Sequence, residues 1–243
     1  MKYMCTKCSL KDKIEKMKLN LDHLIYEKKA DFSNSQIMKL SREIDKYVNE
    51  CIHCKSRISK LNDAITDVKG CHLSFYYYGE VHLTMNMCSY IIKGIQQGEI
   101  VYVSMDEKVF KNLKGMLNRS GIDDERVQFY PVEKLIMLNS KEGRDVLREQ
   151  VSKFGINAVQ KGYTGIRWIG QPSYAIKKTS KNDFLKFESS LSHAVGGSNV
   201  SILCIYDLYD YINDGLIIDN DIIEDSFSTH THLLSEYEIR KII

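Results

Sequence analysis

Two helical patterns near the N-terminus, each accompanied by a Cys-x-x-Cys pair, most constrain how this chain can fold. Apolar residues recur in steps of three and four over residues 10–24 and again over 37–68, where the pattern stops at Gly70. Such spacing places the apolar side chains on one face of a helix. Because only a short break at residues 30–34 separates the two patterns, the helices are expected to pack antiparallel.

Folding the chain back at this break brings its two cysteine pairs together. At 1.5 Å per residue both helices are about 30 Å long, so the pair at the end of the second helix lies opposite the pair before the first. Four thiolates that converge in this way make a closed tetrahedral zinc site. The sequence therefore predicts a structural zinc ion, with a thiol redox pair or simple packing as alternatives; the ligands would be Cys5, Cys8, Cys51 and Cys54.

The second helical pattern continues beyond the cysteines. Its apolar spacing is unbroken through residues 55–69, so we expect a helical connector at 57–69. This stretch would either pack on the following domain or pair with a second copy of the chain, which would make a homodimer through residues 55–69.

From residue 70 onward, short apolar runs alternate with helical patterns, which predicts an α/β domain with a mostly parallel sheet covered on both faces. We divide the chain into a hairpin at 1–56, the connector, and this domain at 70–243. The predicted strands are 72–78, 99–104, 127–130, 164–170, 200–206 and 232–234, and the predicted helices are 80–97, 106–118, 141–161, 181–194 and 219–227.

Charge and hydropathy exclude several classes of protein. No apolar run reaches the ~18 residues needed to cross a bilayer, and the first residues do not resemble a signal peptide, so we expect a cytoplasmic protein without a membrane partner. The net charge of +2 divides into +5 for residues 1–69 and −3 for the rest. That excess is too small to indicate a nucleic-acid partner. Cys71, Cys88 and Cys204 lie in apolar stretches, and we interpret them as core residues.

The second helix carries a short motif, Ser41-Arg42-Glu43-Ile44-Asp45. It resembles the Ser-Gln-Glu-Leu-Asp signature of the Spo-zero-E-like aspartyl-phosphate phosphatases, which are small helical hairpins that dephosphorylate the sporulation response regulator. The resemblance implies that Ser41, Arg42, Glu43 and Asp45 act on the aspartyl phosphate of a receiver domain, with Arg42 in place of the family's Gln. We therefore expect the face of Ser41 and Asp45 to be held out for a partner. The alternative is a solvated helix face with an Arg42–Asp45 ion pair.

Five segments of the α/β region, at 72–78, 94–103, 165–174, 203–207 and 229–232, resemble in order the methanogen/methylotroph DcmR sensory domain, or MEDS domain. The resemblance implies a RecA-like fold. The first strand is not followed by Gly-x-x-x-x-Gly-Lys-Ser/Thr, the loop that cradles nucleotide phosphates, so a small organic effector is the expected ligand. The residues expected to line its pocket, each of which could instead be a structural polar group, are His72, Tyr76, Arg167, Gln171, Tyr174, Asp207 and His230.

These observations predict a signalling regulator in which a small-molecule sensory domain controls a hairpin that binds a phosphorylated response regulator and dephosphorylates it. One alternative is a non-enzymatic, zinc-stabilised sensor or dimerisation protein that acts through protein contacts. A transcription regulator ranks last, because the hairpin has no helix-turn-helix pattern.

Overall fold

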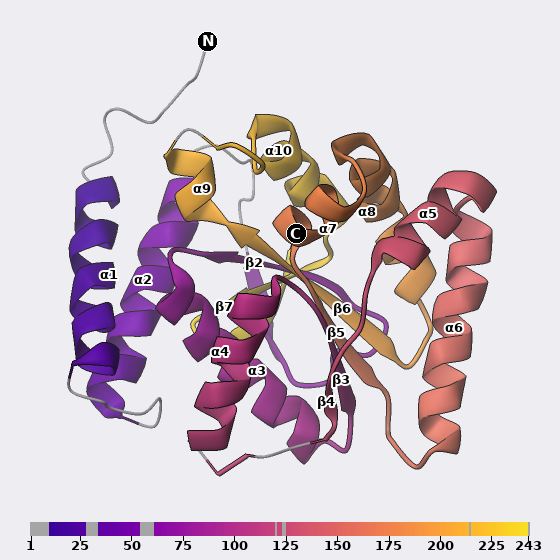
Figure 1. Ribbon diagram of the computed structural model, residues 1–243, viewed down its shortest axis with the longest axis horizontal. Coiled ribbons are helices and arrows are strands. Elements are labelled where there is room, and N and C mark those ends of the chain that lie inside the picture. The colour runs from indigo at the N-terminus through magenta and orange to yellow at the C-terminus, as the bar shows by residue number, and fades with distance from the viewer. Residues whose placement is uncertain are drawn as a thin grey trace.

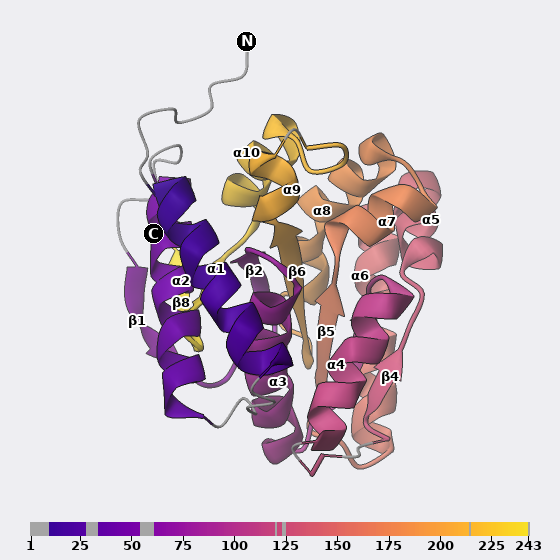
Figure 2. The same ribbon diagram turned by 60° about the vertical axis from the view of Figure 1, so that its left-hand side comes forward.

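The computed structural model describes residues 10–27, 34–53, 61–119, 121–122, 125–213 and 215–242. Two N-terminal helices, α1 (Leu10–Tyr26) and α2 (Ser35–His53), lie side by side against an α/β domain (Figure 1). They run antiparallel, as the short break between them predicts, and Figure 2 shows the pair from a second side.

The α/β domain is built on one eight-stranded sheet with the order β1-β8-β7-β2-β6-β5-β3-β4. Its inner strands read as continuous apolar runs because both faces are covered by helices. This mostly parallel sheet confirms the predicted α/β class. The parallel strands are β2 (His72–Tyr77), β3 (Ile100–Ser104), β4 (Val127–Phe129), β5 (Ile166–Gly170), β6 (Val200–Asp207) and β7 (His232–Ser235).

Helices cover the sheet in two layers. On one face α3 (Glu80–Gln96) and α4 (Glu107–Arg119) pack together, and the hairpin lies against α3. The other face carries α5 (Glu133–Glu142), α6 (Arg144–Gln160), α8 (Lys181–Val195) and α10 (Asn220–Thr229). Two short helices, α7 (Pro172–Lys178) and α9 (Leu208–Ile212), follow the carboxyl ends of β5 and β6.

The helix predicted at 141–161 corresponds to α6, which begins three residues later than predicted, whereas α5 was not predicted. Gly143 has a φ of 88°, a backbone conformation that favours glycine. It ends α5 and precedes α6, so residues 141 and 142, which were predicted to begin the second of these helices, belong to the first.

The helical connector predicted at 57–69 is wrong for residues 61–65. These form β1 (Leu61–Ile65), which pairs antiparallel with β8 (Glu238–Ile242) at the edge of the sheet. Apolar residues four positions apart share a face both in a helix and in a strand, so the spacing alone does not distinguish the two structures. The strand forms here because β8 offers an edge with which residues 61–65 can pair. Of the two alternatives for this stretch, packing on the following domain holds for residues 61–65.

A buried ion pair stabilises the end of the sheet at which the parallel strands begin. Arg167 on β5 pairs with Glu99, and each side chain is only 1% exposed. The guanidinium also donates to the carbonyl of Tyr90 and to the amide oxygen of Gln97. An added Cβ at Gly94 would lie 2.6 Å from Cδ of Arg167, so glycine provides the space that this side chain needs.

We expect Arg167→Ala to destabilise the fold by about 3–5 kcal/mol in urea unfolding, because it leaves the Glu99 carboxylate buried without its cation. The control is Lys153→Ala, which breaks an exposed ion pair with Glu149 and should leave the free energy of unfolding nearly unchanged. Equal losses in both variants would contradict this account.

Candidate functional site

A pocket of about 500 Å³ opens where the parallel strands end. Tyr77, Gln171 and Asp207, at or next to the ends of β2, β5 and β6, contribute to its lining. This is where ligands of open parallel sheets bind. The location agrees with the expectation for the sensory domain.

Three of the predicted ligand residues lie in this pocket. Gln171 donates from Nε2 to the hydroxyl of Tyr77, 3.0 Å away, and accepts the backbone N–H of Asp106 at 3.0 Å. Asp207 accepts two backbone N–H groups at the start of α9, and burial raises the pKa of its carboxyl group. Burial also raises the pKa of Tyr174 to about 12. The hydrogen bonds hold Gln171 and Asp207 in fixed positions at the pocket wall.

The hairpin supplies part of the same pocket. Lys18 of α1 lies over the turn that follows β2, where a Cβ added at Gly79 would be 2.8 Å from Cε of Lys18. Its ammonium is 5.6 Å from the ring centroid of Tyr209 and 3.5 Å from the carboxylate of Asp22. A molecule in the pocket would therefore contact both the α/β domain and the hairpin.

Asp45, in the middle of α2, joins the hairpin to the α/β domain. Its side chain is 1% exposed, and Oδ1 accepts a hydrogen bond from Nε2 of His82 on α3 at 2.9 Å. Oδ2 accepts the backbone N–H of Glu236, in the turn between β7 and β8, at 2.9 Å. Nδ1 of His82 accepts the backbone N–H of Tyr78, so Nε2 carries the proton and donates.

Ser41 lies in the same interface. It is fully buried, and its hydroxyl accepts a hydrogen bond from Nδ2 of Asn86 on α3 at 3.3 Å. Arg42 and Glu43 are exposed, and the guanidinium of Arg42 is 5.5 Å from the ring centroid of Tyr237. Of the predicted phosphatase residues, two are thus accessible and two are covered.

The expectation that the face of Ser41 and Asp45 is held out for a partner is wrong in this structure. Ser41, Ile44, Asp45 and Val48 follow one another in steps of three, one and three, so they share one side of the helix. The apolar members of that set are buried, and they carry the two polar residues into the interface. For the same reason Asp45 does not belong to a solvated helix face.

The predicted zinc clasp falls largely outside the described residues. Cys5, Cys8 and Cys54 lie outside them, and Cys51 is half-buried near the end of α2. The clasp and its zinc ion stay a prediction.

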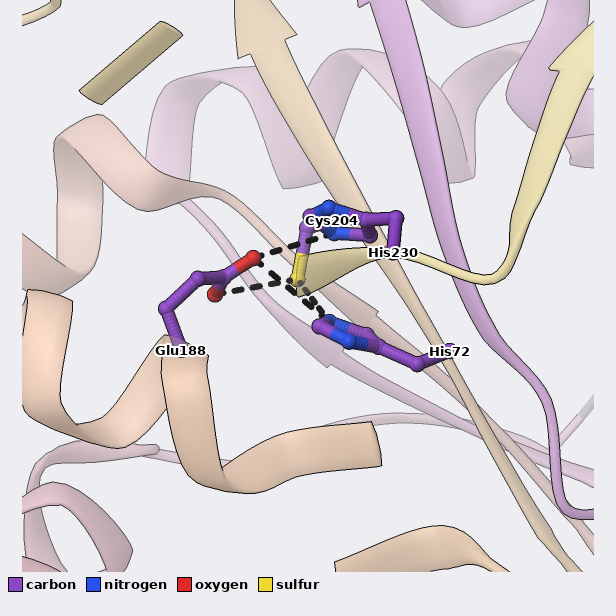
Figure 3. Close-up of side chains that lie close together, drawn as sticks. All are labelled: His72, Glu188, Cys204 and His230. Atoms are coloured by element: carbon purple, nitrogen blue, oxygen red, sulfur yellow. Dashed lines mark hydrogen bonds and ion pairs between the residues drawn. The ribbon is translucent and has the colours of Figure 1, made fainter. Parts of the chain in front are cut away.

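A second polar group lies inside the α/β domain, between the sheet and α8 (Figure 3). It consists of His72, Glu188, Cys204 and His230, each at most 5% exposed. One ligand atom from each residue lies within 4.8 Å of all the others. Imidazole nitrogen, thiol sulfur and carboxylate oxygen are all metal ligands, so this cluster could bind a metal ion.

The carboxylate of Glu188 is the centre of this cluster. Its Oε1 is 3.0 Å from Nε2 of His230 and 3.5 Å from Nε2 of His72, and it accepts the hydroxyl of Tyr206 at 2.6 Å. Burial opposes ionisation of Glu188, whereas a positive charge on the two histidines would lower the pKa of its carboxyl group. An ionised carboxylate at this position therefore needs a positive charge beside it.

The structure separates the remaining predicted pocket residues from the pocket. His72 and His230 belong to the buried cluster. Arg167 is paired with Glu99 at the end of the sheet where the strands begin, away from the pocket. The hydroxyl of Tyr76 bonds the Ser226 hydroxyl at 2.7 Å, beneath α10. The sequence analysis missed Glu188 and Lys18, because each lies in an amphipathic helix without any neighbouring motif.

Comparison with protein families identifies both parts of the chain. Residues 71–231 match the model of the MEDS family (MEthanogen/methylotroph, DcmR Sensory domain). Residues 10–53 match the model of the Spo0E like sporulation regulatory proteins. The two parts together are those of a signalling regulator: a helical hairpin on a sensory domain. The first match covers more than half of the chain, so the chain belongs to the MEDS family, and both resemblances noted in the sequence are confirmed.

Comparison with the curated proteins finds no match. Among solved structures the chain is similar to an ATPase from the type III secretion system of pathogenic bacteria, with a TM-score of 0.40 at 11% identity. That match covers 74% of this chain and 57% of the ATPase chain. It is also similar to the flagellar accessory protein FlaH from Methanocaldococcus jannaschii, with a TM-score of 0.37 at 16% identity, over 69% of this chain and 71% of FlaH.

Among the residues that the structure describes, no helix has both the length and the apolar character needed to span a membrane.

We expect Asp45→Ala to loosen the hairpin selectively. The substitution leaves Nε2–H of His82 and the N–H of Glu236 without their acceptor, which costs about 1–3 kcal/mol for each buried donor. Amide hydrogen exchange in α1 and α2 should therefore accelerate by at least about fivefold, while β5 and β6 keep their protection. The control is Glu50→Ala, an exposed carboxylate on the same helix. A uniform increase over the whole chain would contradict a local role for Asp45.

Proposed function

We propose that this protein is a ligand-responsive regulator of a phosphorelay. In this proposal the MEDS domain binds a small organic effector in the pocket at the strand ends. The hairpin binds a phosphorylated receiver domain and promotes hydrolysis of its aspartyl phosphate. Binding of the effector changes how firmly the hairpin is docked, and thereby whether its motif is available.

The observation that carries this proposal is the burial of Asp45 between the hairpin and the α/β domain. A motif residue whose two carboxylate oxygens are both engaged within the chain cannot at the same time act on another protein. Activity therefore requires undocking, and undocking is a step that a ligand can control. Lys18 links the two events, because it belongs to the hairpin and lines the pocket.

The charges around the pocket support the class of effector. Acidic side chains outnumber basic ones in the pocket lining, and the first strand is not followed by a phosphate-binding loop. A nucleoside triphosphate is therefore a poor fit. A small molecule with hydrogen-bond donors or a positive charge suits this lining better. The charged residues of the lining are Lys18, Lys177, Glu80, Asp106, Asp207 and Asp210.

On the released hairpin the motif residues have distinct tasks. Hydrolysis of an aspartyl phosphate needs an aligned water and stabilisation of the phosphoryl charge. Arg42 would neutralise that charge, and Ser41, Glu43 and Asp45 would orient the water and the partner. The cysteine clasp with its zinc ion (Cys5, Cys8, Cys51 and Cys54) would keep the two helices in register when they leave the sheet.

A second candidate function is non-enzymatic. Ser41 and Asp45 are buried and hydrogen-bonded to α3, as expected if the motif serves to dock the hairpin. The protein would then act through contacts made by the exposed side of the hairpin, where Arg42 and Glu43 lie. The two candidates differ in whether a receiver loses its phosphate.

The test of the phosphatase proposal uses the receiver domain of a sporulation response regulator, phosphorylated with acetyl phosphate. His82→Ala removes one buried hydrogen bond from the docked state but keeps the motif. A loss of about 1–3 kcal/mol raises the undocked fraction, and with it the hydrolysis rate, by roughly tenfold. Asp45→Ala should reduce the rate to that of the receiver alone.

The matched control for this assay is Glu50→Ala, which should hydrolyse at the wild-type rate. Equal phosphate lifetimes with the wild type, His82→Ala and no added protein would reject the phosphatase function. Retained binding of the receiver in that case would favour the non-enzymatic candidate.

The pocket proposal predicts that a ligand from a small-metabolite screen stabilises the full chain. A ligand at 100 times its Kd adds about 2.7 kcal/mol to the free energy of unfolding. Ser173→Trp should abolish this gain, because Ser173 lines the pocket and the indole would fill it. The control Ser189→Trp adds the same group to an exposed site on α8. A ligand that stabilises both variants equally binds elsewhere and would contradict the assignment of the pocket.

A further inference from the structure

The buried cluster of His72, Glu188, Cys204 and His230 has the organisation of a metal site. Its four side chains come from separate elements: the start of β2, the middle of α8, β6, and the segment between α10 and β7. They converge in the interior rather than at the surface, where charged groups gather without a ligand (Figure 3).

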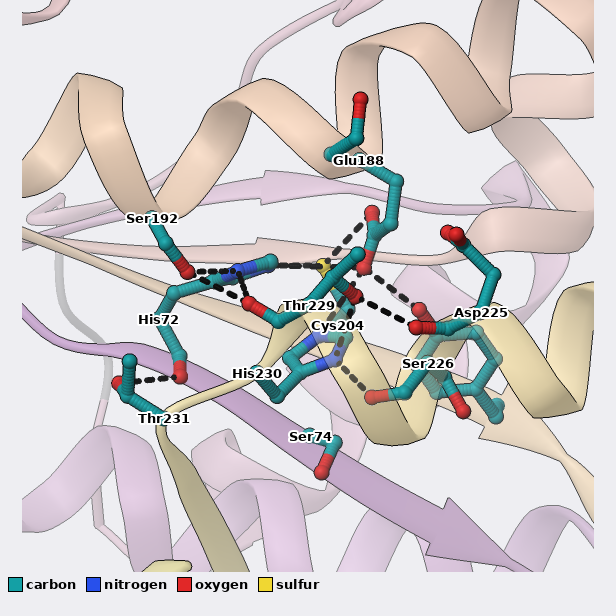
Figure 4. Close-up of polar contacts among 12 residues, drawn as sticks. His72, Ser74, Glu188, Ser192, Cys204, Asp225, Ser226, Thr229, His230 and Thr231 are labelled. Carbon is teal, nitrogen blue, oxygen red and sulfur yellow. Dashed lines mark hydrogen bonds and ion pairs between the residues drawn. The ribbon is translucent and has the colours of Figure 1, made fainter.

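In both histidines the backbone partner of Nδ1 shows which ring nitrogen carries the proton. Nδ1 of His72 is 3.1 Å from the carbonyl oxygen of Thr229, and Nδ1 of His230 is 2.7 Å from the carbonyl oxygen of Ser226 (Figure 4). A carbonyl oxygen only accepts, so each Nδ1 carries a proton and donates it. In the neutral rings both Nε2 atoms then have free lone pairs, and both face the cluster.

The thiol of Cys204 has one proton, which Oε2 of Glu188 accepts at 3.5 Å, so the two lone pairs face acceptor atoms without a donor of their own. Nε2 of His72 is 3.5 Å from Sγ of Cys204 and 3.5 Å from Oε1 of Glu188. Nε2 of His230 is 3.0 Å from the same oxygen, yet it has no partner in hydrogen-bonding geometry. Buried acceptors that face one another need a positive charge between them.

Protons alone supply that charge poorly. One imidazolium would neutralise Glu188 but would leave Nε2 of the other ring without a donor. Two imidazolium ions would repel each other strongly in a buried site, because the ring centroids of His72 and His230 are only 3.9 Å apart. One divalent cation among the four groups balances the carboxylate of Glu188 and a thiolate of Cys204 and leaves the site neutral, which removes the cost of a buried net charge.

The distances suit a small ion. In a tetrahedral zinc site with bonds of about 2.0–2.3 Å, ligand atoms lie about 3.3–3.8 Å apart. The separations given above are 3.0–3.5 Å, and none in the cluster exceeds 4.8 Å. Shifts of about 1 Å or less in the side chains would complete the tetrahedron.

Surrounding groups hold the ligands in place. Tyr206 donates its hydroxyl to Glu188 at 2.6 Å, and the hydroxyl of Ser192 donates to the carbonyl of Thr229 at 2.5 Å (Figure 4). Ligating histidines commonly donate their second nitrogen to a backbone carbonyl in this way, and ligating carboxylates are themselves hydrogen-bonded. Both features are present here.

We propose that this cluster binds one zinc ion through Nε2 of His72, Nε2 of His230, Sγ of Cys204 and the carboxylate of Glu188. The site has four protein ligands and no access to solvent, so the ion is structural and has no position for a reacting water. It ties the start of β2 to the segment that leads into β7, whose far end supplies the turn that binds Asp45.

The test is designed to exclude zinc bound by the N-terminal cysteines. The full chain with Cys5, Cys8, Cys51 and Cys54 all changed to Ser is purified without added metal and analysed by mass spectrometry for metal content. We expect one zinc ion per chain, and X-ray absorption should give one sulfur and three nitrogen or oxygen neighbours. Content well below one ion per chain, with none taken up from added Zn²⁺, would overturn the proposal.

Two further variants on that background keep the test independent of folding. Glu188→Gln is close in shape to the native side chain and should lose the metal on dialysis. Tyr206→Phe removes only the hydrogen bond to Glu188 and should weaken zinc binding about 10–100-fold. Folding of each variant is followed by circular dichroism. A folded Glu188→Gln variant that retains a full zinc ion with unchanged affinity would overturn the assignment.

Discussion

The hydrogen-bonded carboxylate of Asp45 determines how the two parts of this protein are related. One oxygen binds α3 through His82, and the other binds the turn between β7 and β8. Three segments that are distant in the sequence therefore meet at one side chain. A buried carboxylate is stable only when its hydrogen-bonding capacity is satisfied, so the docked arrangement depends on all three segments being in place. The hairpin is consequently part of the same folded unit as the sensory domain.

The pocket and the buried cluster are connected through the sheet. Cys204 and Asp207 lie on the same strand, β6, one in the cluster and the other at the pocket. On β2, the neighbouring strand, His72 and Tyr77 are placed in the same way. The two sites thus share two hydrogen-bonded strands in the most buried part of the domain. Rigid strands are well suited to hold both sites at a constant separation.

Much of the fold follows from local sequence patterns. The six predicted strands and the two hairpin helices agree with the structure because their apolar spacing matches a single period. β1 was missed because residues 61 and 65 fit both the helix period and the strand period, and only pairing with β8 makes this segment a strand. α5 was missed because its apolar residues form one uninterrupted run at 135–138, which does not show the spacing of a helix face.

The candidate sites could be predicted only in part. Gln171, Tyr174 and Asp207 follow strand ends, and the position of a pocket at strand ends is a general rule of such sheets. Glu188 joins His72, Cys204 and His230 through tertiary packing of α8 on the sheet, and no spacing along the chain encodes that contact. The burial of Ser41 and Asp45 was likewise invisible, because the helix period identifies an apolar face but not the surface that covers it.

The position of β1 limits what an undocked hairpin can do. β1 is fixed to β8 by strand pairing, and seven residues, 54–60, separate it from the end of α2. A chain of that length spans at most about 25 Å, so the hairpin remains tethered beside its docking surface. Recapture is then intramolecular, at an effective concentration in the millimolar range. If the hairpin undocks as proposed, a partner protein has to compete with this local concentration, so only a sufficiently concentrated or tightly bound partner would keep the hairpin open.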